Sequence, residues 1–529
     1  MQSLHKLLPL LLLSFFAFDH TLLVHATTAN RTPPSPTSTT ETPSSNPILP
    51  GDHPDPTIIR VGHTYWTTST SGDWAPEFPL FRSNDLRHWT AAGAIFPQTP
   101  TWATGSFWAP ELVYDHSRIV VYYVGRKRNG PLCVAAATAS RPEGPYTDHG
   151  PLVCQPDGSI DPSMARDENG HPFLIWKEDG NSIHQPTPIW AQPLTSDLLH
   201  VTGSKTQLLV NDPSTWEGGV VEAPFILRHA NRFYLFYAGN ACCGVACRYA
   251  EGVARADHLL GPWTKDPSNP IIRPNAAWKC PGHGTAVETP SGNDYFIYHA
   301  YPAAGTVYLG RESVLDPIVW TKNGWPTINN GNGPSDGGAV QEHPLTPTFV
   351  DDFHELQLNA AWQWPVGLTP QWKLNHGTLT IDSSASPEDT ATFLAHSLLG
   401  PSYTATVATE ENGGLGIIGG AHSQLTLSRH GTHLELWRLM GTTRQSLWHT
   451  DDIGATPKLW LRATSSSLSE TSFSYSTDQK HWLQAGPPLS VKDLLPWDQG
   501  LRIGLVAAGP TGTHASFTHF TLADVNRPR

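Results

Sequence analysis

The segments HPDPTIIRVGHTYWTTS (residues 53–69) and SIDPSMARDENGHPFLIWK (residues 159–177) share one pattern. Each begins with an Asp-Pro step, continues as a short apolar run, turns through polar residues, and ends in a second run rich in aromatic side chains. Short runs bounded by turn residues are typical of paired antiparallel strands. The repetition therefore indicates a fold that is assembled from similar hairpins.

Three more segments follow this pattern, and several of the five continue into a third strand and a closing phrase such as GVARADHLLGPWTKD (residues 252–266). The three are FWAPELVYDHSRIVVYYVG (107–125), VEAPFILRHANRFYLFYAG (221–239) and GHGTAVETPSGNDYFIYHA (282–300). Repeats of about 40 to 60 residues with four short strands are the signature of a β-propeller. We predict a five-bladed propeller over residues 47–343, although no strand is evident that returns to complete the first blade.

The pattern changes in the last part of the chain. Alternating runs such as SYTATVATE (402–410) and LRIGLVAAG (501–509) are separated by turn residues, which is typical of a β-sandwich. We predict such a domain over residues 344–529. Charged residues make up only 15% of the chain while Gly (45) and Pro (48) are abundant, and this composition favours many short strands and tight turns. The predicted fold class is all-β.

The N-terminal residues resemble an export signal. His5 and Lys6 precede a short apolar run, and a small-residue cleavage site ends at Ala26, so residues 1–26 are predicted to be a signal peptide. Residues 27–46 are rich in Thr, Ser and Pro and are predicted to be a linker. We expect a secreted or periplasmic protein without a membrane attachment after the signal is removed.

Export places the six cysteines in an oxidising compartment, where disulfides are expected. Cys133 and Cys154 flank one hairpin and could pair. The remaining four could hold a vicinal or a short-loop bridge, and they are Cys242, Cys243, Cys247 and Cys280. A zinc site is less favoured because these four lack two matching pairs with zinc-ligand spacing.

Charge excludes one class of partner. The formal net charge is -13, with 33 Lys and Arg residues and no basic run, whereas a nucleic acid would require a cationic surface. A neutral substrate fits this charge better.

Equivalent positions at the start of the five first strands are expected to meet in space. They recur at intervals of 54, 52, 61 and 61 residues and are Asp55, Ala109, Asp161, Glu222 and His283. Because the first strand of every blade lines the central channel, three carboxylates should converge at one end of it. Neighbouring carboxylates raise one another's pKa, so a functional role is favoured over three unrelated turn-capping residues.

Paired carboxylates, one acting as a base and one as a protonated acid, hydrolyse glycosidic bonds, and a third can tune the acid. Either Glu217 or Glu222 could be the acid, with the strand register favouring Glu222, whereas Glu111 is expected deeper in the channel. The aromatic residues expected to stack on a sugar ring are Trp74, Phe78 and Trp108.

The motifs PDPTII, FWAPEL, IDPSMA, VVEAPFIL and PGHGTAV, in this order, resemble glycoside hydrolase family 43 over about 300 residues. The resemblance implies that Asp55 is the general base, Asp161 modulates pKa and Glu222 is the general acid of an inverting reaction. It further implies that Arg311 contacts the sugar and that His283 faces a calcium ion held mostly through water, with no organic cofactor.

The opening of the last domain, FVDDFHELQLNAAWQWP (349–365), resembles the concanavalin-like sandwich of many such enzymes. Its Trp362, Trp364 and Trp372 are expected to close the pocket, bind polysaccharide or pack in the core. The expected function is exo-hydrolysis that releases α-L-arabinofuranosyl or β-D-xylosyl residues from neutral plant polysaccharides or oligosaccharides. The alternatives are an endo-acting arabinan 1,5-α-L-arabinosidase and a non-catalytic carbohydrate-binding propeller.

Overall fold

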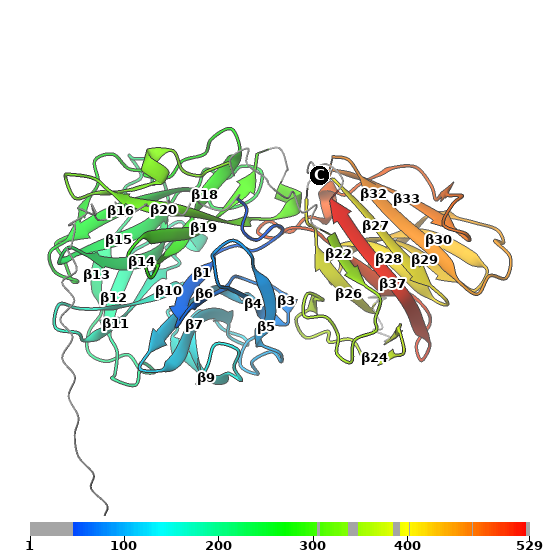
Figure 1. Cartoon of the computed structure of the whole chain (residues 1–529), viewed down its shortest axis with the longest axis horizontal. Helices are drawn as coiled ribbons and strands as arrows, with labels where there is room; N and C mark the ends of the chain where they lie inside the picture. Colours follow the sequence, from blue (N-terminus) through cyan, green and yellow to red (C-terminus); the bar gives the residue numbers. More distant parts are fainter. Residues whose placement is uncertain are drawn as a thin grey trace, which may run out of the picture. The chain divides into compact units, whose positions relative to one another are not determined.

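The computed structural model describes residues 46–303, 307–336, 348–383, 392–400, 402–467 and 469–524 (Figure 1). The predicted signal peptide, nearly all of the predicted linker and the predicted domain boundary at residues 343 and 344 lie outside the described residues. Within those ranges, no helix has both the length and the apolar character needed to cross a membrane.

Five four-stranded antiparallel sheets follow one another along the chain, which confirms the predicted propeller. The first strands of neighbouring sheets lie side by side, and the first and fifth sheets also meet, so the five form a ring. The sheets are β1 (Thr57–Val61), β2 (Thr64–Thr68), β4 (Glu77–Ser83) and β5 (Thr90–Phe96); β6 (Trp108–Asp115), β7 (Arg118–Arg126), β8 (Leu132–Ala139) and β9 (Thr147–Val153); β10 (Ser159–Arg166), β11 (Pro172–Glu178), β12 (Ile189–Pro193) and β13 (Thr206–Leu209); β14 (Val221–His229), β15 (Arg232–Gly239), β16 (Ala250–Ala256) and β17 (Thr264–Lys265); β18 (Trp278–Glu288), β19 (Asp294–Pro302), β20 (Glu312–Trp320) and β21 (Pro326–Ile328). Short 3₁₀ helices are η1 (Gly180–Ile183), η2 (Val307–Leu309) and η3 (Asn329–Gly331).

A non-glycine residue at the equivalent position of each blade's inner strand has a left-handed backbone. The φ angles are 52° at Asp55, 43° at Ala109, 54° at Asp161, 55° at Ala223 and 55° at His283. Register shifts lie at this point in β6, β10, β14 and β18. Such backbone is unfavourable for non-glycine residues and concentrates at functional sites.

This common bulge corrects the predicted alignment of the fourth blade. Its equivalent residue is Ala223, which precedes Pro224 as Asp55 precedes Pro56, and not Glu222. Glu222 therefore occupies the position one residue earlier and pairs with Ala238 just before the register shift.

The ring is closed by chain that precedes the first blade. Leu49 forms an isolated antiparallel bridge with Ser313 of β20, and the Ile48 amide donates to the Ser313 carbonyl (3.0 Å). The Asn46 side chain bonds the backbone of Leu315 on the same strand. The N-terminal segment thus supplies an edge to the fifth blade, which is why no strand returning to the first blade was found in the sequence.

All six cysteines are paired. Cys133 and Cys154 form the disulfide that the sequence suggested, and Cys242 and Cys243 form a vicinal disulfide. The third bridge joins Cys247, in the segment after β15, to Cys280 on β18 of the next blade.

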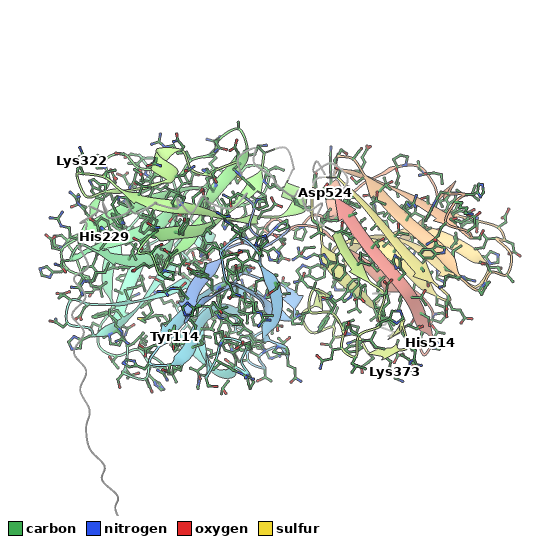
Figure 2. All side chains as sticks on the ribbon, in the orientation of Figure 1. Tyr114, His229, Lys322, Lys373, His514 and Asp524 are labelled. Carbon is green, nitrogen blue, oxygen red and sulfur yellow. A yellow bond between two sulfur atoms is a disulfide. The ribbon has the colours of Figure 1, made fainter. Side chains whose placement is uncertain are left out.

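The C-terminal domain is a sandwich of two antiparallel sheets, as predicted. Figure 2 marks the two ends of its long strand β37 with His514 and Asp524. Residues such as Val407 and Leu461 from the larger sheet and Leu427 and Leu505 from the smaller one pack together in one core. The larger sheet contains β22 (Thr348–Asp351), β24 (Trp372–Asn375), β25 (Thr378–Asp382), β27 (Tyr403–Thr409), β32 (Leu459–Ser465), β33 (Glu470–Ser476), β34 (Leu483–Gln484), β35 (Leu489–Ser490) and β37 (His514–Asp524). The smaller contains β26 (Thr392–Ser397), β28 (Gly413–Gly420), β29 (Ser423–His430), β30 (His433–Met440), β31 (Thr443–His449) and β36 (Arg502–Ala507), with η4 (Lys492–Leu494) before β36.

A buried ion pair joins the propeller chain to the sandwich chain. Asp52 Oδ2 lies 2.6 Å from a guanidinium nitrogen of Arg502, and each side chain is only 2% exposed. The Gly500 amide donates to the same oxygen (3.0 Å), and the Arg311 amide donates to Asp52 Oδ1 (3.2 Å). Nearby, β3 (Trp74–Ala75) pairs with β23 (Trp364–Pro365).

We predict that Asp52→Ala lowers the free energy of unfolding by about 3 to 5 kcal/mol, because it leaves the Arg502 cation buried and unpaired. Urea denaturation followed by tryptophan fluorescence measures the change. The double variant Asp52→Ala/Arg502→Met should recover part of the loss. A loss below about 1 kcal/mol for Asp52→Ala, or simple additivity of the two substitutions, would contradict this account.

Candidate active site

A cavity of about 630 Å³ opens where the inner strands begin, and residues of all five blades line it. The sandwich contributes Trp497 and Asp498 to its wall. Below it, a narrow channel is lined by the bulged residues and the residues that follow them, including Asp55, Ala109, Asp161, Ala223 and His283. Asp55, Asp161 and His283 line both spaces, whereas Glu222 lines only the wider cavity.

Asp55 is a buried carboxylate with several cationic and polar partners. Its Oδ1 lies 2.9 Å from an Arg311 guanidinium nitrogen and 3.3 Å from His283 Nδ1, and its Oδ2 accepts the Thr70 hydroxyl (2.7 Å). Burial by itself would raise its pKa, but Arg311 and then His283 hold the pKa of Asp55 well below its usual range. Asp55 is therefore ionised at neutral pH.

His299 lies behind Asp55 and was not identified in the sequence. Its Nδ1 is 3.1 Å from both the amide nitrogen and the Oδ1 of Asp55. Burial, followed by the charge of Arg311, lowers the pKa of His299 to about 4, so the ring is neutral near pH 7. A neutral ring positions Asp55 without adding another charge.

Asp161 has the opposite electrostatic character. Its Oδ2 accepts the amide of Ala223 (2.9 Å), and its side chain is buried. Burial raises the pKa of Asp161 to about 6, with His283 opposing the increase and the nearby Glu222 charge adding to it. Asp161 thus binds a proton more readily than an ordinary aspartate does.

Glu222 is held by two side chains. Lys177 Nζ lies 2.7 Å from its Oε2, and the Tyr249 hydroxyl donates to its Oε1 (2.8 Å). Burial would raise the pKa of Glu222, but the Lys177 cation lowers it below its ordinary value. Lys177 also contacts Asp179 Oδ1 at 3.0 Å, and these two carboxylates raise the pKa of this buried lysine against the effect of its burial.

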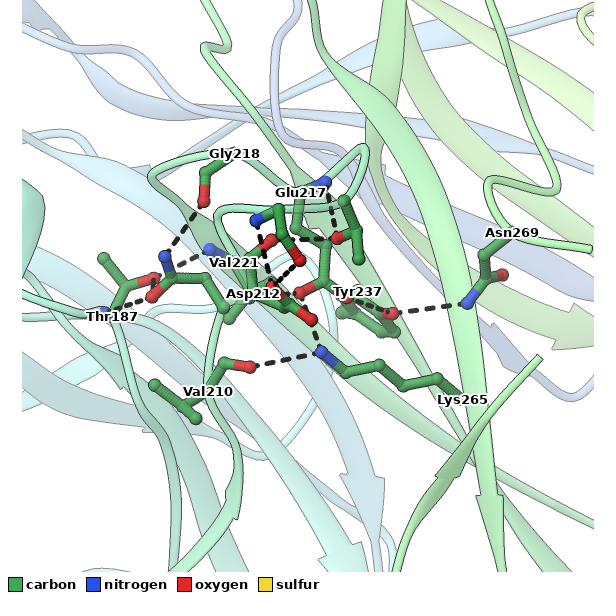
Figure 3. A network of polar contacts seen from close by, with 12 residues as sticks. Thr187, Val210, Asp212, Glu217, Gly218, Val221, Tyr237, Lys265 and Asn269 are labelled. Carbon is green, nitrogen blue, oxygen red and sulfur yellow. Dashed lines mark hydrogen bonds and ion pairs between the residues drawn. The ribbon is translucent and has the colours of Figure 1, made fainter. Parts of the chain in front are cut away.

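The two glutamates that the sequence left as alternatives have different surroundings. Glu217 is 1% exposed and does not line the cavity. Figure 3 shows it within a polar network, in which Lys265 Nζ lies 2.7 Å from its Oε2 and the Tyr237 hydroxyl donates to its Oε1 (2.8 Å). This arrangement favours Glu222 over Glu217 as a group that meets a ligand.

Glu111 lines the narrow channel, deeper than the cavity carboxylates, as expected from its position along the strand. Its Oε2 accepts the Thr57 hydroxyl (2.8 Å), and burial raises the pKa of Glu111 to about 8.

Two of the three aromatic residues that were predicted to stack on a sugar do not line the cavity, so the prediction was wrong for them. Trp74 is buried against Phe393 of the sandwich and beneath the Arg502 guanidinium, because β3 pairs with β23 there. Phe78 is fully buried among Phe96, Phe107 and Tyr123, in the core of the first two blades.

Trp108 does line the cavity, and it meets the sandwich residue Trp497 edge to face, with ring centroids 6.5 Å apart. Trp497 is 64% exposed, so it offers an aromatic surface at the rim. The sandwich tryptophans considered in the sequence do not line the cavity: Trp362 is in the sandwich core, Trp364 lies in β23, and Trp372 is 36% exposed on β24.

Arg311 joins the two domains at the cavity. One guanidinium nitrogen contacts Asp55, and another donates to the backbone carbonyl of Asp498 (3.1 Å). Arg311 is 4% exposed, and it forms a buried ion pair with Asp55. Burial raises the pKa of Asp498 to about 6 despite the nearby Arg311.

Comparison with protein families identifies the propeller. The model of glycosyl hydrolases family 43 matches residues 44–326, more than half of the chain. The chain belongs to this family. The beta xylosidase C-terminal concanavalin A-like domain matches residues 350–523, so the sandwich is also one that accompanies family 43 propellers.

Several curated proteins are similar to this family 43 chain. The xylosidase/arabinosidase 43B of Humicola insolens is 29% identical over 317 residues, which cover 55% of this chain and 56% of that protein. A putative beta-xylosidase of Escherichia coli (strain K12) is 26% identical over 360 residues, covering 60% and 64%. The extracellular exo-alpha-(1->5)-L-arabinofuranosidase ArbA of Cellvibrio japonicus (strain Ueda107) is 27% identical over 305 residues, covering 52% and 86%. The matched segment thus spans less than two thirds of the length of the first two relatives.

Solved structures share the fold over most of the chain. The family 43 protein BlXynB of Bacillus licheniformis has a TM-score of 0.75 at 24% identity, covering 91% of this chain and 100% of that one. A xylan beta-1,4-xylosidase of Bacillus halodurans C-125 has a TM-score of 0.77 at 22% identity, with the same coverage. These likenesses establish the two-domain fold.

The donors near His283 do not form a direct calcium cage. Among the described residues, no group of three or more His, Cys, Asp or Glu side chains is arranged to hold a metal ion. Calcium takes about six to eight oxygen ligands. Near His283, both oxygens of Asp55 already have protein partners, and burial favours the neutral form of Glu111. A water-coordinated ion at His283 stays a prediction.

We predict that Asp161→Asn stabilises the protein above pH 6. The raised pKa means that folded Asp161 binds its proton more tightly than the unfolded chain does. The contribution of this proton to the free energy of unfolding is fully present below about pH 4, and it is lost as the pH rises through about 6. Raising the pKa from about 4 to about 6 corresponds to about 3 kcal/mol, which the variant should retain at pH 7.5.

Urea denaturation of both proteins at pH 4 and pH 7.5 measures this difference, since Asn can still accept the Ala223 amide. If the free energy of unfolding changed by the same amount between pH 4 and pH 7.5 in the variant and in the wild type, the raised pKa of Asp161 would be contradicted.

Proposed function

We propose that this chain is an inverting exo-glycoside hydrolase that releases terminal α-L-arabinofuranosyl or β-D-xylosyl residues from plant polysaccharides or their oligosaccharides. The observation that carries the proposal is the separation of charge states among three carboxyls at one cavity. Asp55 is held ionised, whereas Asp161 and Glu222 form an interacting pair in which Asp161 titrates near pH 6. Such a separation provides a base and an acid at the same pH.

Asp55 is the general base in this proposal. The lowered pKa keeps Asp55 ionised at neutral pH, so its carboxylate is available to accept a proton from a water molecule. Arg311 and Thr70 hold the carboxylate, and His299 accepts the Asp55 amide. The water attacks the anomeric carbon from the face opposite the leaving oxygen. The glycosidic bond breaks as the new C–O bond forms, which inverts the anomeric configuration.

Glu222 is the general acid, and Asp161 tunes it. Burial and the nearby Glu222 charge raise the pKa of Asp161 to about 6, so the protonation states of the two carboxyls are linked. Asp161 Oδ2 accepts the hydrogen bond of the Ala223 amide, whereas Glu222 lines the open cavity. A leaving oxygen that displaces water from Glu222 favours the protonated form of that carboxyl, against the Lys177 cation. The proton then passes from Glu222 to the departing oxygen.

The cavity wall supports action at a chain end. Trp497 and Asp498 from the sandwich bound the cavity together with propeller residues such as Trp108. A cavity bounded in this way suits a terminal sugar better than the middle of a polysaccharide. The relatives are named for xylose, arabinose or both, and one is described as extracellular, which supports pentose substrates and export.

The test is hydrolysis of 4-nitrophenyl α-L-arabinofuranoside and 4-nitrophenyl β-D-xyloside by wild type, Asp55→Asn and Glu222→Gln. We expect wild type to hydrolyse at least one substrate and both variants to lose about 100-fold or more in kcat, because each removes a proton-transfer group. With a 2,4-dinitrophenyl leaving group, which needs little protonation, Glu222→Gln should recover much of its rate and Asp55→Asn should not.

Glu217→Gln is the matched control, since Glu217 is buried outside the cavity, and its kcat should stay within about threefold of wild type. If the 2,4-dinitrophenyl substrate restored the hydrolysis rate of Asp161→Asn and not that of Glu222→Gln, Glu222 would not be the general acid. No wild-type turnover of either glycoside, arabinan or xylan would overturn the proposed function.

A further inference from the structure

The segment between β15 and β16 forms one part of the cavity wall. Asn240, Ala241, Cys242 and Cys243 all line the cavity, beside Glu222 and Lys177. Cys242 and Cys243 are joined by a disulfide and are partly exposed. Both residues of this disulfide therefore belong to the wall of the cavity that Glu222 also lines.

Contacts other than the vicinal disulfide also hold this segment in place. A second bridge, Cys247 to Cys280, spans 33 residues and fastens the segment to β18. The Gly244 amide donates to the Tyr301 hydroxyl (3.3 Å), and the Arg248 amide donates to the Ala241 carbonyl (2.9 Å). In the chain-entropy treatment, the stabilisation by a disulfide grows with the logarithm of the number of residues in the loop that it closes, and a bridge between neighbours closes almost no loop.

The cavity residues close to this bridge in the chain or in the wall are mixed in character. Lys177, Asp179, Asn181 and Asn240 are charged or polar, whereas Val220 and Ala241 are apolar. A disulfide has no hydrogen-bond donor, and sulfur is polarizable and makes favourable contacts with apolar groups. The bridge thus adds to the apolar surface of a wall that also carries charged and polar groups.

The Cys242–Cys243 bridge also packs against buried residues of the propeller. Cys242 packs against a buried cluster that contains Tyr249 and Tyr301. Tyr249 is the residue that donates to Glu222 Oε1. The apolar surface is therefore fixed relative to the proposed acid, which a substrate-contacting group requires.

We propose that the Cys242–Cys243 disulfide is a substrate-contacting surface, which packs against the apolar C–H face of a pentose ring bound beside Glu222. This inference rests on the proposed function. The pentose is either the terminal sugar or the sugar of the leaving group, and the experiment distinguishes the two.

The test compares wild type with Cys242→Ala/Cys243→Ala and Cys242→Ser/Cys243→Ser. The control is Cys133→Ala/Cys154→Ala, which removes a disulfide whose sulfurs do not line the cavity. The measured quantities are kcat and KM for the better aryl glycoside and for the matching pentose disaccharide, the inhibition constant of the free pentose, and Tm. Wild-type turnover tests the proposed function separately, because it does not depend on the variants.

We expect KM to rise about tenfold in the alanine variant and more in the serine variant, with kcat changed less than about threefold, because apolar contact is lost without loss of the proton-transfer groups. An equal rise in the pentose inhibition constant assigns the contact to the terminal sugar. A rise confined to KM for the disaccharide assigns it to the leaving group. Unchanged KM and inhibition constants, or the same change in the Cys133→Ala/Cys154→Ala control, would overturn the proposal.

Discussion

Arg311 is a buried cation whose partners come from three places in the chain. Its guanidinium contacts the Asp55 carboxylate and the Asp498 carbonyl, and its amide donates to Asp52, which pairs with Arg502. Removing any of these partners would leave charge or polarity buried without compensation, at a cost of several kcal/mol. One cation therefore both fixes the ionised state of Asp55 and holds the sandwich segment that carries Trp497 at the cavity.

The distribution of cations explains the different behaviour of the three carboxyls. Asp55 has Arg311, and Glu222 has Lys177, so both are favoured as anions despite burial. Asp161 has no ion-pair partner of its own in the described part of the chain, and its proton is retained to about pH 6. This difference in ion pairing separates the pKa of Asp161 from those of Asp55 and Glu222, and the proposed acid and base catalysis requires such a separation.

The sequence allowed the repeated hairpins, the propeller and the sandwich to be predicted, because strand patterns and turn residues are local signals. Asp55, Asp161 and His283 were found through their repeated positions. Glu222 was aligned one residue away from its true equivalent, although the Ala-Pro step at Ala223 was available as the better guide. Lys177 was missed, and its only signal was a lysine inside the apolar run FLIWK.

Other features depend on contacts between distant segments, which no local pattern contains. Trp74 and Phe78 are of the aromatic type that stacks on sugars, but Trp74 is buried against the sandwich and Phe78 is buried between neighbouring blades. The roles of Trp497 and Asp498 follow only from the way the sandwich chain meets Arg311. The pairing of Cys247 with Cys280 requires two adjacent blades, and so it could not be assigned from spacing.

In the proposed mechanism, Asp55 activates water and does not attack the sugar itself. Proton NMR of the first sugar released from an aryl glycoside distinguishes these two roles, because the anomer formed can be read before mutarotation mixes the two forms. We expect the first product to have the inverted anomeric configuration. Initial release of the retained anomer would require a covalent intermediate on a carboxylate and would contradict this mechanism.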